Sequence, residues 1–171
     1  MKILKTTLII LVIGFVLFVG IAFLTLPVSN NLNVSLDRPS YIIYNILLNQ
    51  SAMPLWIPGL KSVNQLNSNQ NSIGNESEFI VEIENYKIPI IVEIKDLRNN
   101  ELIEYRLEHK DIASNLIFDI SPSGYKSNLS ISYMVKPNNL LTKIAFPLIK
   151  PIMKKYIKEN EDQLIELLKS I

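Results

Sequence analysis

The sequence predicts an α+β domain in which a curved antiparallel sheet of about seven strands surrounds a long C-terminal helix, preceded by one N-terminal transmembrane helix. Three observations support this fold class. An uncharged apolar run covers Leu8–Leu26, strand-like alternating segments follow one another from residue 78 to residue 136, and an amphipathic helical pattern closes the chain. An apolar helix face that covers an antiparallel sheet buries the apolar side of both layers.

The apolar run Leu8–Leu26 is long enough for a membrane-spanning helix, because about 20 apolar residues at ~1.5 Å each cross a ~30 Å hydrocarbon core. Lys2 and Lys5 precede the run, and the first acidic residue is Asp37. This bias predicts a cytoplasmic N-terminus and a domain on the extracytoplasmic side of the inner (plasma) membrane. A cleaved signal peptide is the alternative, but its apolar centre usually spans only ~7–15 residues. The chain therefore divides into an anchor, residues 1–28, and one domain, residues 29–171.

The composition excludes several classes of function. The whole chain has 17 Lys and Arg against 16 Asp and Glu, and two of these lysines precede the anchor, so the domain is nearly neutral. Nucleic-acid binding depends on clustered positive charge, so we expect no nucleic-acid partner. The absence of cysteine excludes disulfides, thiolate metal sites and a lipoprotein anchor, and a single histidine leaves little for a metal centre. We therefore expect no metal and no cofactor, and the oligomeric state stays open.

The elements of the domain follow from periodicity and turn residues. Leu32–Leu36 alternates as a strand after a polar linker at residues 28–33, and Pro39 and Ser40 open a helix that continues to Leu48. A turn around Trp56 and an Asn- and Ser-rich segment, residues 62–77, come next. The latter is predicted to contain one short strand, Val63–Leu66, and a loop. Five further strands are predicted at Glu78–Glu84, Tyr86–Lys95, Leu102–His109, Asn115–Ser121 and Asn128–Lys136.

The last segment is predicted to be a long amphipathic helix. Its apolar face is formed by residues at three- and four-residue spacing, namely Ile149, Met153, Tyr156, Asn160, Leu164, Leu167 and Ile171. Pro147 and Pro151 are expected to confine the regular helix to Ile152 onward, or to kink it.

Four short motifs occur in a particular order along the domain. They are Leu36-Asp37-Arg38-Pro39 between the first strand and helix, the Trp56-Ile57-Pro58-Gly59 turn, Gly74 before the Phe79 strand, and the closing segment Gln163–Lys169. This order resembles the SRPBCC superfamily of START-like, helix-grip domains, which includes polyketide cyclase/dehydrase-like proteins. The similarity covers Leu32 to Ile171 and implies a hydrophobic cavity under the C-terminal helix for lipids, polyketides or other apolar ligands. It implies no universal catalytic residues. The anchor, the Asn-rich loop and the paired prolines depart from the family pattern.

The inward phase of the predicted strands indicates which residues would line such a cavity. The predicted ligand-binding residues are Tyr105, Leu107, His109, Phe118, Tyr133, Val92 and Trp56. The aromatic members of this set fit a closed core as well, and His109 fits an ordinary strand-end histidine. No catalytic residue is assigned, because the strand phase offers only His109 as a cavity acid or base.

These observations favour a non-catalytic, membrane-anchored binding or carrier module for a hydrophobic small molecule or lipid. A polyketide cyclase/dehydrase-like enzyme with a cavity acid or base is one alternative, and a pocketless interaction module is another. The six lysines between Lys136 and Lys158 have no acidic residue among them. A basic amphipathic stretch of this kind can lie on anionic headgroups, but we favour a solvated helix face with four-apart pairs such as Lys155–Glu159.

Overall fold

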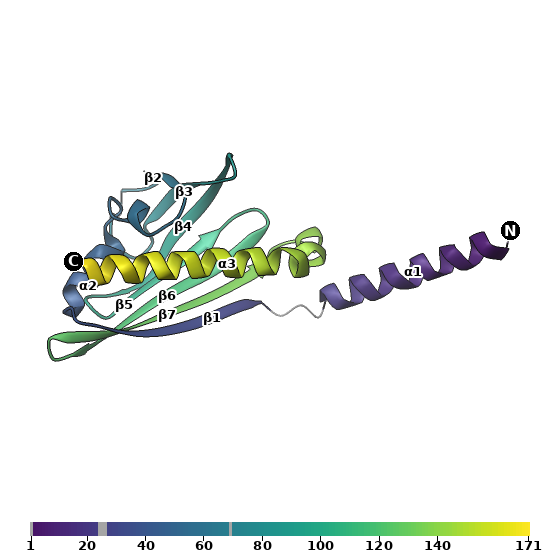
Figure 1. The fold of residues 1–171 in the computed structure, drawn as a ribbon. Coiled ribbons are helices and arrows are strands. Elements are labelled where there is room, and N and C mark those ends of the chain that lie inside the picture. The colour runs from purple at the N-terminus through teal and green to yellow at the C-terminus, as the bar shows by residue number, and fades with distance from the viewer. Residues whose placement is uncertain (1, 24–26, 69) are drawn as a thin grey trace.

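The computed structural model describes residues 2–23, 27–68 and 70–171 of the chain. Its domain is one antiparallel sheet wrapped around a long helix, with a separate helix at the N-terminus (Figure 1). The elements in chain order are α1 (Lys2–Phe23), β1 (Val28–Leu36), α2 (Ser40–Leu48), the 3-10 helix η1 (Met53–Leu55), β2 (Leu60–Gln65), β3 (Glu76–Ile83), β4 (Tyr86–Arg98), β5 (Leu102–Glu108), β6 (Ile112–Ser123), β7 (Lys126–Pro137) and α3 (Leu140–Ser170).

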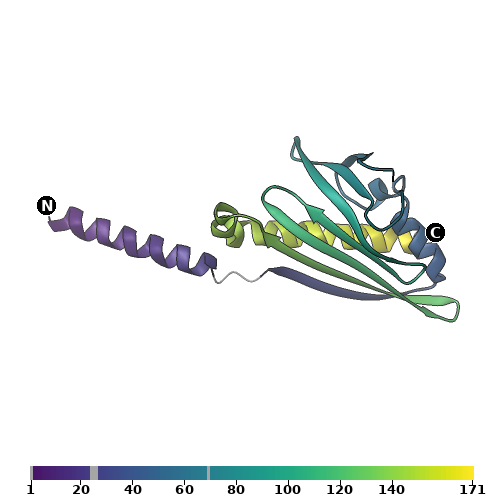
Figure 2. The same ribbon diagram turned by 180° about the vertical axis from the view of Figure 1, so that it is seen from behind.

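The predicted sheet of about seven antiparallel strands is confirmed. Its strands lie in the order β1-β7-β6-β5-β4-β3-β2, so β3 to β7 form a meander and β1 closes against the last strand. Figure 2 presents the outer face of this sheet, with α3 lying behind it on the concave face. Alternation along the strands points one set of side chains at the concave face, where helix and sheet bury them together.

The first strand is longer than the sequence predicts. Residues 28–33 are not a polar linker, because β1 pairs with β7 over its whole length, from Val28 opposite Val135 to Leu36 opposite Ser127. The asparagines in this segment obscure the alternation, but backbone pairing with β7 does not depend on side-chain type. Both ends of β1 are fixed by apolar side chains that are 1% exposed, Val28 and Leu36.

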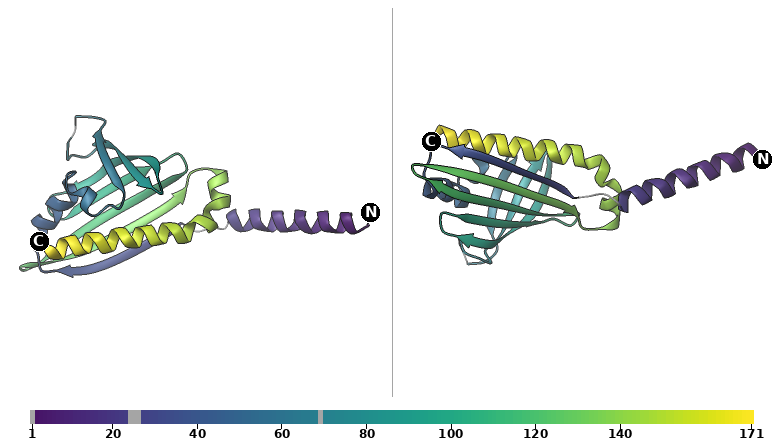
Figure 3. Two further views of the ribbon diagram at one scale, coloured as in Figure 1. Left: turned by 45° about the horizontal axis from the view of Figure 1, so that its top comes forward. Right: turned by 90° about the horizontal axis from the view of Figure 1, so that it is seen from below.

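The last helix also begins earlier than expected. It starts at Leu140, where the Asn139 side-chain oxygen accepts the backbone N–H of Thr142 at 2.8 Å and so caps the first turn. Pro147 and Pro151 lie inside α3 and bend it rather than end it, and its first turns run at an angle to the remainder (Figure 3). These first turns are held by Phe146, which is completely buried against the start of β1 and the end of β7.

The main hydrophobic core lies between the sheet, α2 and the C-terminal half of α3. Its largest fully buried side chains include Phe118, Ile43, Leu47, Leu164 and Leu168. Both buried clusters of the described structure are composed of residues from Val28 onward, so residues 27–171 contain the whole core of the domain.

The turn after η1 is fixed to the sheet by its backbone. Gly59 has a φ of +75°, and its carbonyl accepts the N–H of Glu82 at 2.8 Å. A Cβ at this position would collide with the carbonyl oxygen of Glu82, so both the conformation and the close approach require glycine. The turn is thereby held where Trp56 and Ile57 face the interior of the domain.

The N-terminal helix α1 extends away from the domain, and its C-terminal end lies beside the beginning of α3 (Figures 1 and 3). The end of the predicted membrane segment Leu8–Leu26, residues 24–26, lies outside the described residues. Within the part of the chain that the structure describes, no helix meets both the length and the hydropathy required to cross a membrane.

Candidate ligand-binding pocket

The pocket exists because α3 covers only part of the concave face of the sheet. α3 packs beside β1 and β7, and α2 packs on β6, while β3 to β5 curve away from both helices. A space of about 300 Å³ is left between the curved strands, the Trp56 turn and the middle of α3. This volume is at the lower end of the range for small-molecule sites, which is ~300–1,000 Å³.

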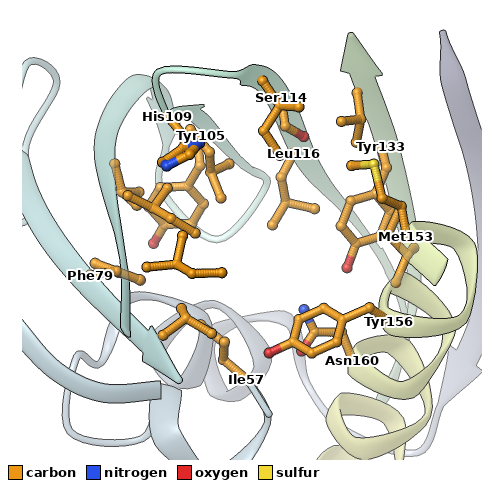
Figure 4. A pocket seen from close by; sticks show the side chains of 18 of the residues that line it. Ile57, Phe79, Tyr105, His109, Ser114, Leu116, Tyr133, Met153, Tyr156 and Asn160 are labelled. Carbon is orange, nitrogen blue, oxygen red and sulfur yellow. The ribbon is translucent and has the colours of Figure 1, made fainter. Parts of the chain in front are cut away.

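Most side chains in the pocket wall are hydrocarbon or aromatic. They come from η1 and the following turn, from β3 to β7, and from α3, and Figure 4 shows how they surround the space. The lining residues are Met53, Trp56, Ile57, Phe79, Val81, Ile83, Ile88, Ile90, Val92, Tyr105, Leu107, His109, Ile112, Ser114, Leu116, Tyr133, Val135, Ile152, Met153, Tyr156, Ile157 and Asn160.

Six of the seven residues predicted to bind ligand lie in this wall: Val92, Tyr105, Leu107, His109, Tyr133 and Trp56. Phe118 does not line the wall, and its position agrees with the alternative of a closed core. It is completely buried behind the wall and makes edge-on contacts with Trp56 at 6.0 Å and with Tyr105 at 6.3 Å between ring centroids. Phe118 therefore supports two rings of the wall from the core.

The two tyrosines expected to give polarity to the cavity differ in their hydroxyl groups. Tyr105 donates its hydroxyl to the backbone carbonyl of Leu47 at 3.2 Å, so this group is already used within the protein. The Tyr133 hydroxyl points into the pocket (Figure 4). Burial raises the pKa of both phenols well above the ordinary value, and the charge of Glu161 adds to this effect at Tyr133. Both therefore stay protonated at physiological pH, and Tyr133 can donate a hydrogen bond to a ligand.

Two further polar atoms of the wall are buried without a hydrogen-bond partner among the described residues: Nε1 of Trp56 and Oδ1 of Asn160. A buried donor or acceptor that stays unpaired costs about 1–3 kcal/mol. Close to them, the Tyr156 hydroxyl donates to the carbonyl of Pro58 and joins α3 to the Trp56 turn. The Tyr133 phenol is therefore the polar group that Figure 4 shows directed into the pocket.

His109 lies where β5 ends and contributes to the same wall. Its Nδ1 accepts the backbone N–H of Asp111 at 3.3 Å and lies 3.8 Å from the Asp111 carboxylate. The Asp111 carboxylate also accepts a hydrogen bond from the Asn139 amide at 3.1 Å. These contacts fix the imidazole at the edge of the pocket next to a carboxylate, and they also close the β5–β6 turn.

Glu161 is a buried acid that the prediction of cavity residues did not include, because that prediction considered only inward-facing residues of the strands and Glu161 lies on α3. It is 5% exposed and accepts a hydrogen bond from the Asn30 amide at 2.7 Å. Burial raises the pKa of this carboxyl, and the Asn30 hydrogen bond opposes the rise. Its position was readable from the spacing, since Glu161 falls four residues after Ile157 and three before Leu164, on the inner face of the helix.

Within the described ranges, no three His, Asp or Glu side chains gather as a metal site would require. The expectation of no metal and no cofactor stays a prediction.

No known protein family matches the sequence, and no well-characterised protein matches it either. Solved structures do match the fold. An aromatase/cyclase from a Streptomyces species superposes with a TM-score of 0.67 and 10% identity, over 84% of this chain and 94% of that one. A START superfamily protein from Mycobacterium smegmatis gives 0.63 and 20% identity over 83% and 94%. A conserved protein from Geobacillus kaustophilus gives 0.65 and 13% over 82% and 95%. At these identities the likeness shows the fold, which is the START-like, SRPBCC-like fold that the order of elements indicated.

Proposed function

We propose that this chain binds and carries a hydrophobic small molecule or lipid in the pocket between the sheet and α3. The observation that carries the proposal is the pocket itself, an apolar space of about 300 Å³. Burial of apolar ligand surface is worth about 25 cal/mol per Å², so a wall of this composition favours hydrocarbon over polar ligands. A closed core or a pocketless interaction module would have no use for such a space.

The few polar atoms of the wall narrow the class of ligand. The Tyr133 hydroxyl can pair with a small polar group of a ligand, such as a hydroxyl or a carboxylic acid. No lysine or arginine lies in the wall, so nothing there neutralises a phosphate. The proposed ligand is therefore mainly hydrocarbon with one small polar group.

We further propose that the domain is held at the inner (plasma) membrane by its N-terminal segment, with the N-terminus in the cytoplasm and the domain on the extracytoplasmic side. The support is the sequence: an uncharged run from Leu8 to Leu26 that follows Lys2 and Lys5. Such an anchor would hold an apolar pocket beside a reservoir of apolar ligands.

A cyclase/dehydrase-like enzyme is the second candidate, and one observation favours it. His109 lies in the wall with the Asp111 carboxylate 3.8 Å from its Nδ1, so an imidazole, the side chain that most often serves as a general acid or base, borders the cavity. Replacement of His109 by Gln distinguishes the two functions, because a carrier keeps its affinity and an enzyme loses turnover with binding retained.

The test of the carrier function is to identify what residues 27–171 hold after expression and gentle purification. Native mass spectrometry should show an added mass, and solvent extraction should release a lipid or a related apolar molecule. Trp56 is the only tryptophan of the chain and lines the pocket, so removal and return of the molecule should change its emission. If nothing copurifies and no member of a panel of fatty acids and neutral lipids alters Trp56 emission, the carrier function is wrong.

A further inference from the structure

One end of the domain combines several features that the pocket alone does not explain. The antiparallel register places the β3–β4 hairpin, the β5–β6 turn, the end of β7 and the first turns of α3 at the same end, opposite the β6–β7 hairpin. The C-terminal end of α1 lies beside the start of α3 at this same end (Figure 1).

The first turns of α3 expose large apolar side chains at this end. Leu141, Leu148 and Ile152 are 80%, 69% and 68% exposed, and we call these three residues the outer face of α3. Their spacing of seven and four residues places them on one side of the helix. The opposite side carries Phe146, which is completely buried. The first turns of α3 are therefore apolar on two sides: one side packs against the sheet, and the outer face has no packing partner among the described residues.

One lysine, Lys155, lies next to the outer face of α3, three residues after Ile152 and seven after Leu148, whereas Lys143 and Lys154 lie on another side of the helix. No acidic residue occurs in the sequence between Asp119 and Glu159, and α3 carries five lysines before Glu159, of which Lys143, Lys154, Lys155 and Lys158 are exposed. Lys155 lies 3.7 Å from the Glu159 carboxylate on the same helix. Leucine and isoleucine next to lysine are the composition of helices that lie in the interface of anionic membranes.

We propose that the outer face of α3 docks into the surface of an anionic lipid bilayer. Leu141, Leu148 and Ile152 then enter the headgroup region, and Lys155, which lies next to them, pairs with a lipid phosphate. The bend at Pro147 and Pro151 turns the first turns of α3 away from the axis of the rest of the helix, so they can lie along a surface while the remainder stays in the domain.

The docked orientation gives the pocket a route to lipid, and this step rests on the proposed carrier function. Ile152 belongs to the outer face and also lines the pocket. Ile83 of the β3–β4 hairpin lines the pocket as well and is 38% exposed. The pocket therefore reaches the surface between this hairpin and α3, at the end that would face the bilayer. An apolar ligand could then pass between membrane and pocket without crossing water.

The test uses the full chain reconstituted into vesicles of phosphatidylcholine with about one-third phosphatidylglycerol. The sequence contains no cysteine, so Leu141→Cys and Leu148→Cys can each carry a single environment-sensitive fluorophore. Tyr125→Cys is the matched control, because Tyr125 is 95% exposed on the β6–β7 hairpin at the far end. Nitroxide-labelled lipids should quench the fluorophore at 141 and 148 several-fold more than at 125.

A chain that is only tethered to the vesicle through α1 should show the same quenching whether or not lysines of α3 are replaced, whereas docking of α3 should depend on them. A lysine near an anionic surface changes binding about fivefold, so Lys155→Gln should lower the ratio of docked to undocked chains about fivefold. Lys126→Gln, away from α3, should leave it unchanged. Equal quenching at positions 125, 141 and 148, or quenching at 148 that does not change in Lys155→Gln, overturns the proposal and leaves a protein partner as the occupant of this face. Ligand binding by residues 27–171 in solution is measured separately, so failure of docking does not count against the carrier function.

Discussion

Replacement of a small residue of the pocket wall by a large one should fill the pocket and weaken ligand binding strongly without unfolding the domain. Ser114 lies on β6 and faces the cavity, opposite Leu107 on β5 and Val135 on β7. In Ser114→Phe the ring enters a space of about 300 Å³ that already exists, so the 1–3 kcal/mol that overpacking a filled core would cost is avoided. We expect the free energy of unfolding to change by less than about 1 kcal/mol.

The loss of affinity follows from the ligand volume that the ring displaces. A phenyl ring takes the place of about four methylene groups of a ligand chain, and each buried methylene is worth about 0.8 kcal/mol. The variant should therefore bind about 3 kcal/mol more weakly, or roughly 200-fold in Kd. Asn115→Phe is the matched control, because Asn115 is the next residue on β6 and is exposed on the outer face of the sheet.

The assay is energy transfer from Trp56 to a fluorescent polyene fatty acid, titrated into residues 27–171. Trp56 lines the pocket and is the only tryptophan, so transfer reports occupancy of this site. Thermal unfolding of each variant is measured in parallel. If Ser114→Phe is folded and binds the probe as tightly as Asn115→Phe does, the ligand does not occupy this space and the reasoning is refuted.

Two further predictions concern the buried acid of α3 and the N-terminal anchor. Burial raises the pKa of Glu161 above its ordinary value of 4.5, so the folded chain binds this proton more tightly than the unfolded chain. The free energy of unfolding should therefore fall as the pH rises from 4.5 toward the pKa of the folded state. Glu161→Gln removes this fall and should be more stable than the parent at neutral pH in denaturant titrations; equal pH profiles would contradict it. If the domain lies outside the inner membrane, Tyr125→Cys should react with a maleimide that cannot cross this membrane, in intact cells whose outer envelope has been made permeable to the reagent. Labelling only after lysis would place the domain in the cytoplasm.

The part of the pocket wall that lies on β4, β5 and β7 could be predicted in part, because strand alternation is a local property. Once Tyr105 is assigned to the inner side, Leu107 and His109 follow at period two, and the neighbouring strands add Val92 and Tyr133. All five lie in the wall. The seven-stranded antiparallel sheet was predictable for the same reason, since short alternating segments joined by brief turns leave few other arrangements.

The sequence did not indicate which inward-facing residues of a strand line the cavity and which are covered by other side chains. Phe118 is an example. It has the same inward phase as Tyr105, but Trp56 packs on it from a distant turn and completes its burial. Which inward residues meet a cavity and which meet another side chain depends on how far α3 stands from each strand. That distance is set by tertiary packing, on which periodicity carries no information.

Two boundaries depend on long-range contacts rather than on local rules. Pro147 and Pro151 were expected to confine the regular helix to Ile152 onward or to kink it, and the second alternative agrees with the structure, because Phe146 anchors the preceding turns and keeps them helical. Residues 28–33 have few apolar side chains, yet pairing with β7 makes them a strand. Both boundaries fall at the end of the domain that adjoins α1.

The meeting of anchor, basic helix and pocket mouth at one end has a topological cause. β1 runs away from α1, and each antiparallel hairpin reverses the chain, so β7 returns to the end where β1 began. α3 follows β7 directly and must therefore begin beside the end of α1. Insertion or loss of one strand in the meander would place the start of α3 at the far end, away from a membrane. The order of elements thus places the first turns of α3 beside the proposed anchor, and these turns carry three exposed leucines, Leu140, Leu141 and Leu148.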